Sequence, residues 1–258
     1  MQSDLFPPQP WILPLAGGQH VDGARSDTWL IDRVCAPRLE VRAELTKRAF
    51  IFRDKPHRTV LRDILGDASR LLAHVPSLEK AVQAAVAEVV LLKAQPAFDI
   101  SHSEPRWPQT IFISTPYRRG EVSALRAVEN VVHEAMHLQL TILEQSRPLV
   151  ADRSDQIASP WREEIRSLQG VLHGLYVFRC ISAFFANLDS LDVLGTEGFG
   201  YVTGRRGQIA QEISRLDFDR LAGGMTTEGL SLLIALAKEH VTLVSTANTS
   251  PGYPKYTI

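Results

Sequence analysis

The stretch VVHEAMHLQL, residues 131–140, places two histidines and one glutamate within a run of otherwise apolar side chains. Apolar residues recur at helical spacing on both sides of it, from about 121 to 144, until Pro148 ends the pattern. A helix with such apolar flanks must be buried, and an unpaired cluster of imidazoles and a carboxylate inside a protein is costly. The stretch therefore predicts a long central helix whose buried polar side chains interact with another group of the protein or with a ligand.

His133 and His137 are four residues apart, so on a helix they lie on one face, about 6 Å apart along the axis. Two imidazoles in this arrangement can bind one metal ion, and Glu134 can reach a water or a substrate group beside it. The HExxH spacing therefore predicts a metal site, with Glu134 as a catalytic acid–base residue or as a group that orients a ligand. The alternative is that two structural histidines flank an acid by chance.

A metal site needs a third protein ligand, and two kinds of residue compete for this role. The residues after His137 lack the glycine and the third histidine that metzincins show. A thermolysin-like zinc site would take Glu163 or Glu164 from WREEIRSL. The competing ligand is His173 in LQGVLHGLYVF, an apolar helix in which a lone histidine otherwise needs a hydrogen-bond partner. Spacing leaves both choices open.

The whole chain is predicted to form a mainly helical α+β single domain over residues 1–258, with a minor β component and the metal site between two long helices. Residues 1–25 are predicted as an irregular lead-in, PQTIFISTP (108–116) as one short strand, and GTEGFGYVTG (195–204) as a glycine-rich loop. TWLIDRVC (28–35) fits either a strand or a helix edge. The predicted helices besides the HExxH helix span 58–75, 77–93 with Ser77 as N-cap, 161–188, 205–216 and 227–244.

Composition limits the class of protein and its partners. Of the 258 residues, 45% are hydrophobic and 22% charged, as in an ordinary globular protein. With 28 basic and 29 acidic residues, the formal net charge of -1 favours neither nucleic acid nor a membrane as partner. Cys35 and Cys180 are far apart in sequence and are predicted to be buried thiols. Without a signal-like start or a long uninterrupted apolar tract, the protein is expected to be cytoplasmic.

HEAMHLQL together with SPWREEIRSLQGVLHGLYVFRCISAFF (159–185) resembles a family of HExxH-motif peptide-modification enzymes, associated with ribosomally made peptide natural products. In that family the HExxH motif is followed by PWR, by DPRPL-x-G-x-LHG-x-Y-x-F and by an aromatic pair. The resemblance covers residues 125–190 clearly and does not reach the first 100. The residues that match the pattern are Pro160, Trp161, Arg162, Arg166, Leu168, Gly170, Leu172, His173, Gly174, Tyr176 and Phe178.

The resemblance implies an iron(II)- and 2-oxoglutarate-dependent hydroxylase that uses O₂ to modify a residue of a precursor peptide at its β-carbon. His133, His137 and His173 would hold the iron. Glu134 keeps both of its roles open, because an oxygenase must leave positions free for 2-oxoglutarate and O₂. A carboxylate ligand stays a candidate, since two histidines and one carboxylate are usual for such iron. The alternatives are a zinc peptidase with Glu134 as general base and a non-catalytic peptide-binding module with a structural metal.

The chain departs from the family pattern at DPRP, where it reads EIRS (164–167) without either proline. A helix that begins near residue 161 would align Arg162, Arg166 and His173 on one polar stripe. Arg166, about 10 Å along this helix from His173, would then be best placed to clamp the distal carboxylate of 2-oxoglutarate, with Arg162 at about 16 Å. The rival arginines follow the glycine-rich loop and are Arg205 and Arg206.

Overall fold

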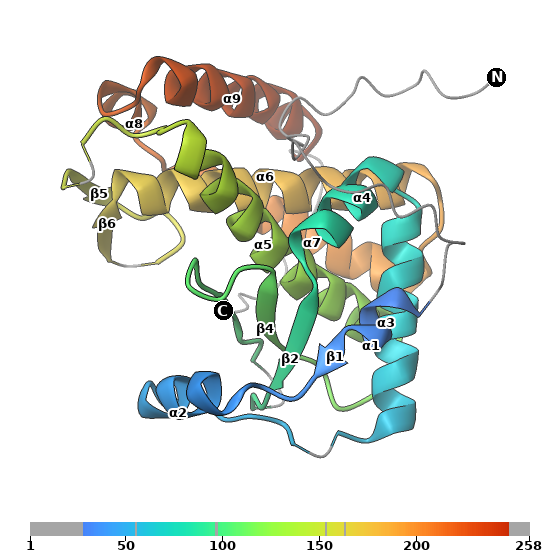
Figure 1. Ribbon diagram of the computed structural model, residues 1–258. Coiled ribbons are helices and arrows are strands. Elements are labelled where there is room, and N and C mark those ends of the chain that lie inside the picture. The colour runs from blue at the N-terminus through green and yellow to red at the C-terminus, as the bar shows by residue number, and fades with distance from the viewer. Residues whose placement is uncertain (1–27, 55, 96–97, 153, 163, 248–258) are drawn as a thin grey trace.

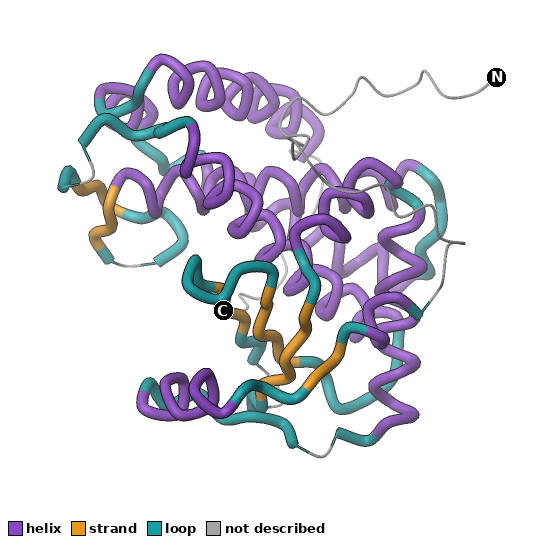
Figure 2. Tube along the Cα trace, in the orientation of Figure 1, coloured by secondary structure: helices purple, strands orange, loops and turns teal. Residues whose placement is uncertain are grey.

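The structure, a computed structural model, describes residues 28–247 except 55, 96–97, 153 and 163. The predicted lead-in at 1–25 and the candidate ligand Glu163 lie outside the described residues. Helices make up 60% of the structure and strands 12%, which confirms the prediction of a mainly helical fold with a minor β component (Figure 2).

The first half of the chain contains both helices and the strands of the main sheet, and long helices dominate the second half (Figure 1). The strands are β1 (Val34–Cys35), β2 (Glu88–Leu92), β3 (Ser101–Ser103), β4 (Thr110–Ser114), β5 (Gln156–Ala158) and β6 (Ile165–Ser167). The helices are α1 (Trp29–Asp32), α2 (Leu39–Lys47), α3 (Arg58–Ala73), α4 (Pro76–Ala85), α5 (Glu121–Ser146), α6 (Leu168–Ser190), α7 (Thr196–Ile213), α8 (Phe218–Gly223) and α9 (Thr227–Ala247).

Four strands form one sheet in the order β1-β2-β4-β3. β1, β2 and β4 run parallel, whereas β3 runs antiparallel to β4 at the edge of the sheet. β4 is buried along its whole length, and its continuous apolar run is typical of a strand covered on both faces. One face of the sheet packs against α5, and α2 lies on the other side (Figure 1). Val41 and Leu45 of α2 form a hydrophobic cluster with Val90 and Phe112 of the sheet. β5 and β6 form a separate antiparallel pair.

The two long helices α5 and α6 cross the centre of the molecule and pack against each other (Figure 1). α5 also contacts α3, α4 and α7, so it is surrounded by protein. Every residue of α6 from 171 to 180 is buried. Burial of each large apolar side chain contributes about 1.5–3 kcal/mol, so these two helices form the stable interior on which the polar site is built.

One described helix, α6, has the length and apolar composition that a membrane crossing requires. Within the fold, however, 78% of its apolar window is buried against other parts of the protein. This burial is typical of the core helix of a soluble protein, and the structure is compatible with one.

The predicted helix over 77–93 is wrong at both ends. It begins at Pro76, with Val75 as N-cap in place of Ser77, because proline suits the first helical turn. It ends at Ala85, and 88–92 form strand β2. The β-branched residues Val89 and Val90 pair with β4 in parallel register, and this long-range pairing overrides the helical spacing of the apolar residues.

TWLIDRVC, which fits either a strand or a helix edge, forms both α1 and β1. Because β1 is the outer strand on its side of the sheet, Cys35 is exposed, and the prediction that it is buried is wrong. Cys180 on α6 is buried as predicted.

The glycine-rich segment 195–204 is not a loop, because most of it forms the first half of α7. Its helix start is stabilised by Glu121, which accepts hydrogen bonds from the backbone N–H groups of Gly195 at 2.7 Å and Gly198 at 2.8 Å. A Cβ at Gly198 would lie 2.4 Å from the carboxyl carbon of Glu121. Because Gly198 has no side chain, the carboxylate of Glu121, 77 positions earlier in the sequence, can approach the start of α7. There it accepts hydrogen bonds from two N–H groups that have no partner within the helix.

Removal of this carboxylate is expected to destabilise the protein. Glu121→Ala should lower the free energy of unfolding by about 2 kcal/mol, since bonds to a charged acceptor contribute more than neutral ones. Urea unfolding measures the change, and Glu197→Ala is the matched control, because Glu197 is an exposed acid in the first turn of the same helix. The control should lose at most about 1 kcal/mol. Equal losses in the two variants would contradict the capping role.

The helix predicted over 161–188 begins later, at Leu168. Residues 165–167 form β6, and Ser167 is the N-cap, whose hydroxyl accepts from the backbone N–H of Gly170 at 3.1 Å. Arg162 and Arg166 therefore do not share a helical stripe with His173, and the distances along the helix that favoured Arg166 do not apply. The pairing of β6 with β5 keeps this segment extended in spite of its missing prolines.

Candidate metal centre

The structure brings together the three predicted histidine ligands. His133 and His137 lie one turn apart on α5, with ring centroids separated by 4.9 Å. His173 comes from α6, and its ring stacks beside that of His137 at 5.7 Å with 26° between the planes. His137 and His173 are 36 positions apart in sequence, and the packing of α5 against α6 brings them together.

All three histidines line one cavity of about 260 Å³. β3 and the residues that follow it form one wall, the two helices form another, and Arg162 completes the lining. The volume is slightly below the roughly 300–1,000 Å³ of pockets for drug-sized ligands, so the cavity suits a smaller molecule. Its full lining is Ser101, His102, Ser103, Glu104, Pro105, His133, Glu134, His137, Leu138, Thr141, Arg162 and His173.

The two α5 histidines are half-buried, and the loss of water around their rings favours the neutral form. The pKa of His133 falls to about 3, first because of burial and then because of the positive charges of Arg205 and Arg162. Burial, with the neighbouring His133 and His173, also lowers the pKa of His137 well below its ordinary value. A neutral imidazole keeps the lone pair that a metal ligand needs.

Glu134 lies beside these imidazoles and is held from the side of the sheet. Ser103 on β3 donates a hydrogen bond to its Oε2 at 2.6 Å, and Ser101 also bonds to it. Burial raises the pKa of Glu134 to about 7, although the two serine bonds lower it in part. The carboxyl group can therefore both accept and donate a proton near neutral pH.

Glu144 is a site residue that the sequence reasoning missed. Its Oε2 accepts hydrogen bonds from Nε2 of His173 at 2.8 Å and from Nε2 of Gln169 at 2.5 Å, and its side chain is 4% exposed. Glu144 is seven residues after His137, which is two helical turns, so it lies on the same face of α5. The seven-residue spacing from His137 could have pointed to Glu144. It identifies a site residue only once α6 is known to pack on this face of α5 and to bring His173 to it.

Trp161 and Gly174 explain part of the PWR and LHG pattern. A Cβ at Gly174 would lie 2.6 Å from Nε1 of Trp161, so the glycine lets the loop before β6 fold back onto α6. Trp161 then packs edge-on against Phe178 at 5.4 Å, and Phe178 packs against the ring of His133 at 5.5 Å. These aromatic contacts fix the position of His133 from the side away from the sheet.

The two arginines predicted to bind 2-oxoglutarate lie in different surroundings. Arg162 lines the cavity, its side chain is 62% exposed, and its only ion pair among the described residues is with Glu164 at 3.9 Å. Arg166 does not line the cavity, and its Nε donates to Glu164 at 2.6 Å. The side chain of Glu164 is 46% exposed and is not part of the cavity lining. The geometry favours Arg162 over Arg166.

The rival arginines on α7 have partners of their own and do not line the cavity. Nε of Arg205 donates to Glu129 at 2.6 Å, and its guanidinium carbon lies 5.4 Å from the centre of the Phe178 ring. Arg206 pairs with Asp189 at 3.2 Å. Arg205 thus supports the aromatic wall behind His133 from within the core.

The histidines suit a metal ion in kind, because imidazoles bind iron(II) and zinc alike. Within the described residues no three His, Cys, Asp or Glu side chains gather their ligand atoms around one point. His173 uses Nε2 for Glu144, so Nδ1 is the nitrogen left for an ion. A carboxylate bonded to the second nitrogen is the usual way in which metal-bound imidazoles are oriented. The residue types therefore suit an ion at His133, His137 and Nδ1 of His173, but the ligand atoms of these described residues do not converge on one point in this structure.

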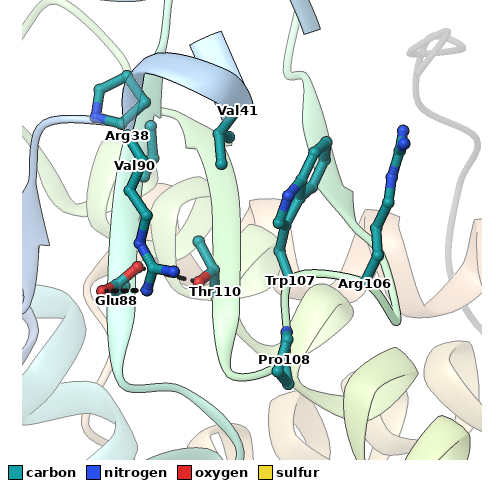
Figure 3. A pocket seen from close by; sticks show the side chains of 9 residues that line it. Arg38, Val41, Glu88, Val90, Arg106, Trp107, Pro108 and Thr110 are labelled. Carbon is teal, nitrogen blue, oxygen red and sulfur yellow. Dashed lines mark hydrogen bonds and ion pairs between the residues drawn. The ribbon is translucent and has the colours of Figure 1, made fainter. Parts of the chain in front are cut away.

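A second, smaller cavity of about 90 Å³ lies beside α2 (Figure 3). Its one carboxylate, Glu88, pairs with Arg38 at 3.2 Å and accepts a hydrogen bond from Thr110 at 3.1 Å. It has no histidine in its lining, and the charged groups of Arg38 and Glu88 satisfy each other. The 260 Å³ cavity is therefore the better candidate for chemistry.

Glu104 anchors the end of β3 at the cavity wall. Arg48 and Arg106 both pair with its carboxylate, and Nε2 of His102 lies 2.8 Å from it. Partial burial opposes ionisation of Glu104, but the bonds from Arg106, Arg48 and His102 lower its pKa to about 2. The ionised carboxylate therefore ties β3 to the end of α2.

This ion cluster predicts a pH dependence of stability. The folded-state pKa of Glu104 is below its ordinary value of 4.5, so its contribution is complete above about pH 4.5 and is lost as the pH falls towards 2. Glu104→Gln should unfold at a lower urea concentration at pH 7 and should lose less stability between pH 4.5 and 3. Urea midpoints at these pH values test this, with the exposed Glu40→Gln as control. Parallel pH curves for the wild type and Glu104→Gln would contradict it.

No protein-family model matches the chain, and no curated protein matches it. The assignment of a function therefore depends on the residues of the site and on their geometry.

Proposed function

We propose that the protein is an iron(II)- and 2-oxoglutarate-dependent hydroxylase that acts on a residue of a ribosomally made precursor peptide, at the β-carbon. The observation that carries the proposal is the convergence of His133, His137 and His173 on one cavity that leaves room for small molecules. The resemblance over residues 125–190 supplies the reaction class and the peptide substrate. In this reaction one atom of O₂ converts a C–H bond to C–OH, and the other enters 2-oxoglutarate, which loses CO₂ to give succinate.

Each residue of the cavity has a role in this proposal. Iron(II), when bound by the three histidines, supplies the electrons for O₂ activation. Glu144 holds the ring of His173 in one tautomer through Nε2. Glu134, fixed by the serines of β3, orients the peptide by a hydrogen bond and exchanges protons near neutral pH. Arg162 binds the distal carboxylate of 2-oxoglutarate, because this arginine lines the cavity and its ion pair with Glu164 is long, at 3.9 Å.

The test is succinate production by the full chain. The protein is loaded with iron anaerobically, given 2-oxoglutarate and O₂, and assayed with and without peptides encoded beside its gene. We expect succinate to rise with one such peptide and the peptide to gain the mass of one oxygen atom. The Arg162→Met variant should raise the 2-oxoglutarate concentration needed for half-maximal rate, whereas Arg206→Met should not. A peptide that is cleaved instead, or no succinate with any peptide, would contradict the proposal.

The second candidate is a zinc peptidase, and the raised pKa of Glu134 is the observation that favours it. A buried carboxyl group with a pKa of about 7 beside two histidines suits a general base that activates water. Because Glu164 lies outside the cavity lining, His173 is the better third ligand for such a site too. Zinc-loaded protein should then cleave peptides, and Glu134→Gln should abolish cleavage while zinc is retained.

A further inference from the structure

We propose that β3 is the docking strand for the substrate, which binds as an extended acidic peptide segment added to the edge of the sheet across the cavity. The inference rests on the proposed function and names how its peptide substrate is recognised. β3 occupies the edge of the four-stranded sheet, and its three residues all line the 260 Å³ cavity.

The hydrogen-bond register determines which backbone groups of β3 are available. Ser114 N–H donates to the carbonyl oxygen of Ile100 at 2.7 Å, so in the antiparallel ladder His102 is the next residue bonded to β4. The backbone N–H and C=O groups of Ser101 and Ser103, the residues on either side of His102, then point away from β4. Among the described residues neither serine takes part in a further backbone hydrogen bond. An added strand would satisfy these groups, as in other complexes formed by strand addition.

The side chains of β3 indicate that such a peptide would lie beside the three histidines of the cavity. Ser101 and Ser103 face α5, and both bond to Glu134, the neighbour of His133. A peptide strand paired with their backbone groups therefore runs alongside Glu134. Successive side chains of a strand alternate in direction, so every second residue of the peptide points into the cavity.

The charges around the cavity favour an acidic peptide. Beside Glu104, which lines the cavity, Arg48 and Arg106 pair with that carboxylate from outside the lining, and Arg106 also reaches Glu44, which pairs with Lys47, so this cluster has three cations and two carboxylates. Beside Arg162, which also lines the cavity, Glu164 and Arg166 lie outside the lining, so this cluster has two arginines and one glutamate. Each cluster thus carries one surplus positive charge next to the cavity, whereas the charged side chains of the lining itself are Glu104, Glu134 and Arg162. Aspartate or glutamate side chains that flank the modified residue would meet both.

The experiment measures binding of a random decapeptide library to the full-length protein without iron, so it does not depend on hydroxylation. We expect retained peptides to be enriched in aspartate and glutamate over the input. Fluorescein-labelled copies of the best peptide are then N-methylated at one backbone position at a time. Methylation at alternate positions should weaken binding by roughly fivefold or more, and at the positions between them by much less, because a strand bonds through every second residue.

Variants of Ser103 test the same contact from the protein side. Ser103→Pro and Ser103→Ala both lose the hydroxyl that binds Glu134, but only proline loses the outward N–H, and proline is tolerated at such an edge position. Ser103→Pro should therefore bind the best peptide at least about fivefold more weakly than Ser103→Ala. Circular dichroism checks that both are folded, and the N-methyl series on the wild type decides the matter if the proline variant is not.

Three results would overturn the proposal: no retained peptide, retained peptides rich in lysine or arginine, or methylation effects without a two-residue period. Its failure is separate from failure of the proposed function. A retained acidic peptide that gives no succinate with the iron-loaded protein overturns hydroxylation and leaves the docking strand supported. Succinate production from a peptide that does not follow the two-residue pattern overturns the docking strand alone.

Discussion

Replacement of His137 by alanine is expected to abolish iron binding. His137 is the central ring of the three, stacked on one side with His173 and adjacent on the other to His133, so its loss removes one of the three proposed ligands and the ring between the other two. The affinity for iron(II), measured anaerobically by competition with a coloured chelator, should fall by more than the roughly 10–100-fold that loss of an outer hydrogen-bond partner costs. Succinate production should fall to background with it.

Two further variants make this prediction specific. Glu144→Gln keeps a hydrogen-bond acceptor beside His173 but removes the charge, and it should weaken iron binding by about 10–100-fold while the fold is retained. His74→Ala changes an exposed histidine at the end of α3 and should leave iron affinity unchanged. Iron affinity of His137→Ala equal to that of His74→Ala would show that the histidines are structural.

The largest expected effect on stability comes from Glu129. Its carboxylate accepts from Nε of Arg205 at 2.6 Å and from the hydroxyl of Tyr201 at 2.7 Å, and its side chain is 9% exposed. The two terminal nitrogens of Arg205 are buried without a hydrogen-bond partner in the described part of the chain. Glu129→Ala would remove the only carboxylate that pairs directly with this guanidinium among the described residues and leave it to weaker, longer-range interactions such as that with Glu212, so it should lower the free energy of unfolding by about 3–5 kcal/mol.

A matched surface pair separates the effect of burial from that of the ion pair itself. Arg119 and Asp63 form an ion pair at the same distance, 2.6 Å, but their side chains are 56% and 36% exposed. Asp63→Ala should cost at most about 1 kcal/mol, because water solvates the arginine that remains. Both values come from urea unfolding of the full chain. Similar costs for the two variants would mean that water reaches Arg205 and that the wall behind His133 is looser than its burial indicates.

Local signals predicted the central parts of the site. The helical spacing of apolar residues predicted α5 and most of α6, and the HExxH spacing predicted that His133 and His137 share a face. Each pattern involves residues only one or two helical turns apart, so it can be recognised in a short window of sequence. The third histidine came from the resemblance and from its apolar surroundings, and the packing of α5 on α6 brings it to the other two.

Long-range contacts determined the elements that were predicted wrongly. β2 resembles the end of a helix in sequence, and it is a strand because β4 pairs with it. The first half of α7 resembles a loop, and it is helical because Glu121 caps it from 77 positions away. The short extended segment before α6 is held by β5. In each case the partner that stabilises the local conformation lies outside any window that a local pattern covers.

By itself, the sequence determined that a buried helix carries two imidazoles and a carboxyl group on neighbouring positions, because backbone geometry fixes that arrangement wherever the helix forms. Only the tertiary structure decided that Glu144 orients His173, that serines of β3 hold Glu134, and that Arg162 rather than Arg166 lines the cavity. Glu144 and His173 are 29 residues apart in sequence, Ser103 and Glu134 are 31 apart, and the position of Arg162 depends on how its loop folds back. These contacts form only when the packing of apolar surfaces sets the distances between the helices and the sheet.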